Sequence, residues 1–73
     1  MDTVSPADLT DDDFLAFSRQ LRQEMDHLDG REWQEAQDLR DECHRGRVHN
    51  SLTARIRVAR ALNARRLRER AET

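Results

Sequence analysis

The chain has 73 residues, of which 36% are apolar and 38% are charged. A chain of this length forms one domain, here residues 1–73, and its thin core leaves little apolar surface to enclose a substrate. We therefore expect no enzyme, no small-molecule substrate and no cofactor. No apolar run approaches the length that spans a bilayer, so we also expect no membrane contact.

The charge is divided between the two halves of the chain. Residues 1–42 hold thirteen Asp or Glu against four Arg, whereas residues 43–73 hold nine Arg against two Glu. The net charge of −2 therefore conceals one strongly acidic and one strongly basic half. All thirteen basic residues are Arg, which reflects either the codon bias of a GC-rich genome or a use of forked guanidinium contacts to phosphates and carboxylates.

Two features indicate the compartment. Residues 1–6 lack the basic and apolar regions of a signal peptide. Cys43 is the only cysteine and so forms no internal disulfide, which agrees with a reducing environment. Both features predict a cytoplasmic protein.

The first part of the chain predicts a flexible arm over 1–10 and an acidic helix over 11–28. Thr10 is a suitable cap, and the carboxylates of residues 11–13 stabilise the positive end of the helix dipole. Apolar residues recur every three or four positions along one face of this helix: Phe14, Phe17, Leu21, Met25 and Leu28.

A second helix is predicted over 31–45. Asp29 and Glu32 form a candidate capping pair at its start, and Gly46 is the expected left-handed residue that ends it. Its apolar stripe is weaker than that of the first helix: Trp33, Ala36, Leu39 and Cys43.

A basic third helix is predicted over 50–70, with Asn50 or Ser51 as its cap. Its expected core-facing stripe is Val48, Leu52, Ile56, Ala59 and Leu62. Beyond Leu62, arginines occupy the line of that stripe, which predicts a basic helical C-terminal tail. The fold class that follows is all-α, a small helical hairpin or three-helix bundle with a mobile N-terminus.

The candidates for chemistry are few. Cys43, His44 and His49 are the only neighbouring residues with ligand atoms for a soft metal, and His27 is the only further candidate. The paired spacing of zinc modules is absent, so we expect no metal site. Ser51 with His49 would be a nucleophile and base without an orienting third group, so we expect no catalytic site.

The basic segment is the candidate partner-binding surface, because its density of arginines is sufficient to contact several phosphates or an acidic protein patch. The alternative is that these arginines pair with the acidic helix of the same molecule. Trp33 is either a core residue or an anchor for a partner. The candidate partner-binding residues are Arg45, Arg47, Arg55, Arg57, Arg60, Arg65, Arg66, Arg68 and Trp33.

The size, the acidic half from Asp2 to Glu42 and the Arg-only basic helix from Leu52 to Arg70 resemble the small transcription regulators that lytic phages make against host RNA polymerase. The resemblance covers the whole chain in length and charge layout, and no residue roles are carried over because no motif aligns. It implies a protein of the host cytoplasm that binds bacterial RNA polymerase, inhibits initiation by displacing the sigma factor and promotes antitermination. Direct contact with an RNA or DNA backbone in the complex is left open.

Two other interpretations remain. One is a small Arg-rich nucleic-acid-binding protein, although the connection before residue 50 is longer than a helix-turn-helix turn and no aromatic residue lies among the arginines. The other is an oligomerisation or adaptor module, in which the acidic helix of one subunit meets the basic helix of another.

Overall fold

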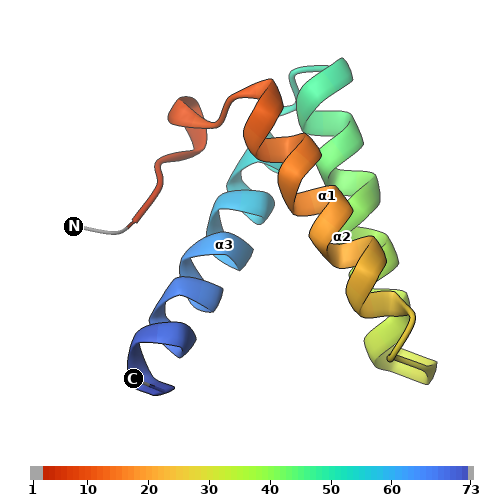
Figure 1. The fold of residues 1–73 in the computed structure, drawn as a ribbon. Coiled ribbons are helices and arrows are strands. Elements are labelled where there is room, and N and C mark those ends of the chain that lie inside the picture. Colours follow the sequence, from red (N-terminus) through yellow and green to blue (C-terminus); the bar gives the residue numbers. More distant parts are fainter. Residues whose placement is uncertain (1–2, 73) are drawn as a thin grey trace.

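The computed structural model describes residues 3–72, which form the short 3-10 helix η1 (Pro6–Asp8) and three α-helices, α1 (Asp11–Met25), α2 (Gly30–Val48) and α3 (Leu52–Glu72). The predicted all-α fold is thereby confirmed. The helices α1 and α2 are antiparallel and lie side by side, and α3 diverges from this hairpin toward the C-terminus (Figure 1). Within the described range, no helix is both long and apolar enough to cross a membrane.

The helix α1 begins with a capping box. The Thr10 hydroxyl accepts the Asp13 N–H at 3.2 Å, and the Asp13 carboxylate accepts the Thr10 N–H at 2.8 Å. The helix ends at Met25 and not near residue 28, because the next N–H groups bond three residues back and tighten the chain into a turn. Four of the residues predicted for its apolar face are buried: Phe14, Phe17, Leu21 and Met25.

The prediction that Gly46 ends the second helix is wrong. The helix α2 continues to Val48, and the left-handed residue after it is Asn50, with a φ of 51°. Gly46 is buried against α1, where a Cβ would lie 2.8 Å from two carbons of the Phe14 ring. Glycine is needed here for close helix packing and not for a helix stop. At the other end Asp29 is the N-cap residue, but its side chain makes no capping hydrogen bond.

The buried face of α3 agrees only in part with its apolar pattern, because Ala59 is buried and Leu62 packs against the core as predicted. The start of α3 is as expected, because the Ser51 hydroxyl accepts the Ala54 N–H at 3.2 Å. Val48 and Leu52, however, are 50% and 66% exposed. The buried residues of α3 are Ala54, Val58 and Ala59. Small side chains at this face let α3 approach the hairpin closely, so the larger residues near its start lie outside.

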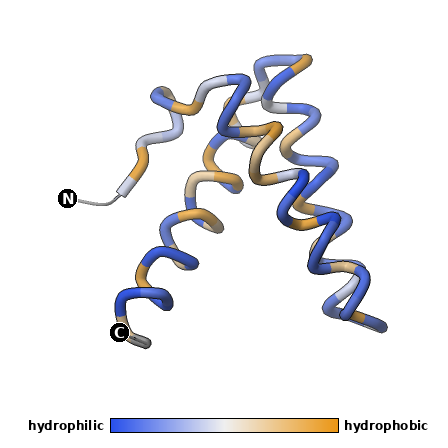
Figure 2. The backbone as a smooth tube through the Cα atoms, viewed as in Figure 1, coloured by the Kyte–Doolittle hydropathy of each residue, from blue (hydrophilic) through white to orange (hydrophobic). Residues whose placement is uncertain are grey.

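The core is a thin seam. Figure 2 shows that hydrophilic residues dominate α2, with apolar positions only at intervals. Leu28, Leu39, Ala61 and Leu62 are partly buried and pack at the edge of the core. So small a core predicts modest stability, and single contacts between helices should have measurable effects.

Residues 3–10 are the described part of the segment expected to be a flexible arm, and they lie against α3. The Asn63 side-chain amide accepts the Val4 N–H at 2.8 Å and donates to the Val4 carbonyl oxygen at 3.1 Å. Leu9 is buried in the core. Residues 1–2 of the expected arm lie outside the described part of the chain.

Arg55 secures this arm to α3. Its guanidinium donates to the carbonyl oxygens of Pro6 and Leu9 at 3.1 and 3.0 Å. Replacing Arg55 with methionine keeps an unbranched stem but removes these two bonds, the bond to the Asn50 side chain and the contact with the Phe14 ring. We expect the free energy of unfolding to fall by about 1–2 kcal/mol. Hydrogen exchange at the Asp8 amide should also become faster. The matched replacement of exposed Arg60 with methionine should change neither quantity, and equal effects of the two variants would contradict this role.

Candidate partner-binding site

Several of the predicted arginines make contacts within the molecule. Arg65 of α3 donates two hydrogen bonds to the carboxylate of Glu24 in α1, at 2.6 and 2.8 Å. Arg45 and Arg57 both donate to one oxygen of the buried Glu42, at 2.7 and 3.1 Å. The Arg65 pair agrees with the alternative in which the arginines pair with the acidic helix, whereas Glu42 lies in α2. The Arg65 and Arg57 pairs join α3 to both helices of the hairpin.

Other predicted residues extend from the surface. Arg47 and Arg60 are exposed and form no ion pair with any other residue in 3–72. Arg66 and Arg68 are also exposed, on the diverging part of α3. Trp33 is 40% exposed near the start of α2, so it is not a core residue and remains a candidate anchor.

Cys43 differs in exposure from His44 and His49. Cys43 is buried, whereas His44 and His49 are exposed and their ring centroids are 6.0 Å apart in an edge-on arrangement. Among residues 3–72, no three His, Cys, Asp or Glu side chains are placed to hold a metal ion.

The Cys43 thiol should react slowly. Burial raises its pKa from 9.0 to about 11, because the thiolate is poorly solvated there. At pH 8 the thiolate fraction is then about 100-fold lower than for an unperturbed thiol, and we expect at least this loss of rate toward a disulfide reagent. Addition of urea above the unfolding midpoint should restore the rate of a free thiol. A rapid reaction of the folded protein would contradict the burial.

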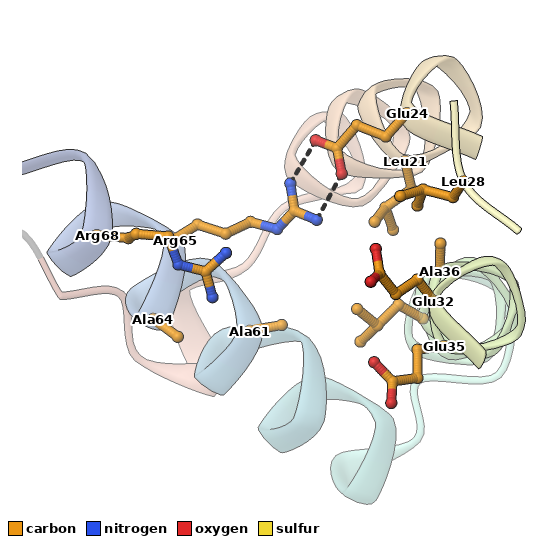
Figure 3. A pocket seen from close by; sticks show the side chains of 11 residues that line it. Leu21, Glu24, Leu28, Glu32, Glu35, Ala36, Ala61, Ala64, Arg65 and Arg68 are labelled. Carbon is orange, nitrogen blue, oxygen red and sulfur yellow. Dashed lines mark hydrogen bonds and ion pairs between the residues drawn. The ribbon is translucent and has the colours of Figure 1, made fainter. Parts of the chain in front are cut away.

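An open cleft of about 530 Å³ lies between the diverging part of α3 and the α1–α2 hairpin (Figure 3). Its apolar lining consists of Leu21, Leu28, Ala36, Leu39, Ala61 and Ala64. The hairpin contributes three carboxylates, Glu24, Glu32 and Glu35, and α3 contributes the guanidinium groups of Arg65 and Arg68. The cleft therefore has an apolar floor between an acidic and a basic wall.

The pair formed by Arg65 and Glu24 spans the cleft from α3 to α1 (Figure 3). The hydrogen bonds from Arg65 hold the pKa of Glu24 below its usual value, and those same bonds raise the pKa of Arg65. The guanidinium carbon of Arg65 also lies 5.1 Å from the centroid of the Phe17 ring. These contacts set the separation of α3 from the hairpin and hence the width of the cleft.

Arg65 and Arg68 are predicted from the sequence as partner-binding residues, but the cleft is not. The sequence predicts core positions for Leu28 and Leu39, and only a capping role for Glu32. The available signal was the spacing of Glu32, Glu35 and Leu39, which places them along one side of a helix. That signal does not show that a second helix diverges opposite them.

Comparison with known proteins identifies no relative. No protein-family model matches the chain, and no curated protein and no solved structure is significantly similar to it. We therefore infer function from the surfaces of the molecule and from the resemblance in size and charge layout.

Proposed function

We propose that this protein is a non-enzymatic transcription regulator that binds bacterial RNA polymerase, inhibits initiation by displacing the sigma factor and promotes antitermination. The observation that carries the proposal is that exposed groups of both charges lie on one small fold. The carboxylates of residues 11–13 are exposed at the start of α1, whereas Arg47, Arg60 and Arg68 are exposed on the end of α2 and on α3. Such a molecule is complementary to a large partner that offers potentials of both signs.

The internal ion pairs reduce the number of predicted arginines that are available to bind a partner. Arg65 is half-buried in its pair with Glu24, and Arg57 shares Glu42, so a partner would gain less from them than from unpaired groups. Arg47 and Arg60 are the arginines from which we expect the largest contribution. Their charges steer association and should make binding weaker at high salt.

The test measures affinity for purified bacterial RNA polymerase, with and without nuclease. We expect binding that survives nuclease and that falls about tenfold when Arg47 and Arg60 are both replaced with serine. The matched control replaces two exposed arginines of the acidic half, Arg19 and Arg31, with serine and changes the net charge equally. Its affinity should stay within about threefold of the original protein.

Transcription assays with the same purified RNA polymerase test the proposed regulatory activity. Transcription from a sigma-dependent promoter should decrease when the protein is added before initiation, and preformed elongation complexes should read through a terminator more often. A protein that binds no polymerase, or binds it without either effect, would contradict the proposed function.

The alternative is direct binding to nucleic acid, which the exposed Arg60, Arg66 and Arg68 along α3 favour. It predicts a complex with bare duplex DNA or RNA whose affinity falls steeply with salt, because bound counterions are released. In that case nuclease would abolish the recovery of polymerase from a lysate.

A further inference from the structure

The cleft between α3 and the hairpin has the composition of a site for a protein segment. Its floor contains Leu28 and Leu39, which are half-buried, and Ala61, which packs at the edge of the core. A volume of about 530 Å³ is within the range that holds a few side chains or a drug-sized molecule. The cleft is open to solvent and is lined by side chains of all three α-helices, so it suits a segment of a protein partner better than an enclosed small ligand.

The acidic wall has unneutralised charge. Glu32 and Glu35 are exposed, stand one turn apart on α2 and point into the cleft in Figure 3. Neither forms an ion pair with another residue of the described chain. The third carboxylate, Glu24, is already held by both nitrogens of the Arg65 fork. The first two carboxylates are therefore available to a cation from a partner.

We propose that this cleft binds a segment of the protein partner in which a Lys or Arg stands beside an apolar residue. The apolar side chain would cover the floor at Leu28 and Leu39, and the cation would lie between Glu32 and Glu35. A nucleic acid does not fit this wall, because carboxylates repel phosphates. This inference rests on the proposed function for the identity of the partner, while the chemistry of the cleft stands independently of it.

The first test compares two double variants that each remove two negative charges from α2. In one, Glu32 and Glu35 are replaced with glutamine. In the control, Asp38 and Asp41 are replaced with asparagine, which keeps an oxygen to accept the hydrogen bonds from Gln34 and Gln37. We expect the affinity for purified RNA polymerase to fall about tenfold in the cleft variant and to change less than threefold in the control. Equal affinities of the two variants would overturn the inference and leave the proposed function standing.

The second test needs no polymerase. The isotope-labelled protein is titrated with two synthetic helical peptides while its backbone amide NMR signals are recorded. One peptide contains Leu and Lys, and the other contains Leu and Glu. We expect the Lys peptide to shift the amides of Leu28, Ala61 and Ala64, and the Glu peptide to leave them unchanged. Shifts confined to other surfaces, or the same response to both peptides, would overturn the assignment.

The two tests separate the two proposals. If the protein binds no polymerase, the proposed function fails and the peptide titration alone decides whether the cleft takes a basic segment. Replacement of Ala64 with tryptophan fills the open side of the cleft from an exposed position and should abolish the peptide shifts without unfolding the protein. If the same amides shift on concentration of the protein alone, the occupant is a second copy and the partner assignment is wrong.

Discussion

Replacement of Gly46 with alanine is expected to destabilise the protein by about 1–2 kcal/mol, although alanine is the better helix former by about 1 kcal/mol at an exposed site. The new Cβ would lie 2.8 Å from two carbons of the Phe14 ring. That ring is 1% exposed and lies under the Arg55 guanidinium, so displacing it would disturb the core. For a domain of this size the loss corresponds to a fall in Tm of about 4–8 °C per kcal/mol, which thermal unfolding would detect.

A double-mutant cycle tests whether the contact with Phe14 is the cause. Replacement of Phe14 with leucine destabilises the core by itself, but it removes the ring carbons that the new Cβ would meet. In that background the change of Gly46 to alanine should be neutral or stabilising, because only the gain in helix propensity remains. The same loss in both backgrounds, measured by urea unfolding, would show that the close approach to Phe14 is not responsible.

The number of helices and the buried face of α1 could be predicted because both depend on local chemistry. The Thr10 cap and the spacing from Phe14 to Met25 act within one helix, and both are found in the structure as expected. The end of α2 was not predictable in this way. Gly46 and Asn50 both tolerate a left-handed backbone, and only the packing of α1 against α2 determines which of them adopts it.

The face of α3 depends on the tertiary arrangement as well. Leu52 and Ile56 are more apolar than Ala54, so the pattern alone favoured their side of the helix. In the fold, the side with Ala54 and Val58 meets the hairpin because a small side chain permits a shorter distance between helices. The size of the groove available on the hairpin is not visible in the sequence of α3.

The candidate site was predictable only as a region of high charge. The density of arginines after residue 43 is visible in the sequence, but the partner of each is not. Arg65 reaches Glu24, 41 residues earlier in the chain, and Arg57 reaches Glu42 in the neighbouring helix. These pairs and the cleft depend on how α3 is placed against the hairpin. That placement is set by the packing of all three helices and is not visible in any one of them.

Replacement of Glu24 with glutamine is expected to remove an acid-sensitive part of the stability. The hydrogen bonds from Arg65 hold the pKa of Glu24 below 4.5 in the folded protein. A carboxyl group with a lowered folded-state pKa contributes stability above its unfolded-state pKa, and this contribution disappears as the pH falls through the folded-state value. The side chains of Arg65 and Glu24 are 26% and 36% exposed, so solvent screening limits the expected loss at pH 7 to about 1 kcal/mol.

The unfolding free energies of the original protein and the Glu24 variant should therefore converge as the pH falls below 4.5 and through the lowered pKa of Glu24. Other carboxyl groups titrate in both proteins, and their contributions cancel in the difference. Replacement of Asp26 with asparagine is the matched control, because its pair with Arg22 is exposed on both sides and should add no measurable stability. A difference that stays constant down to pH 3 would show that Glu24 acts through packing and that the Arg65 pair does not hold α3 to α1.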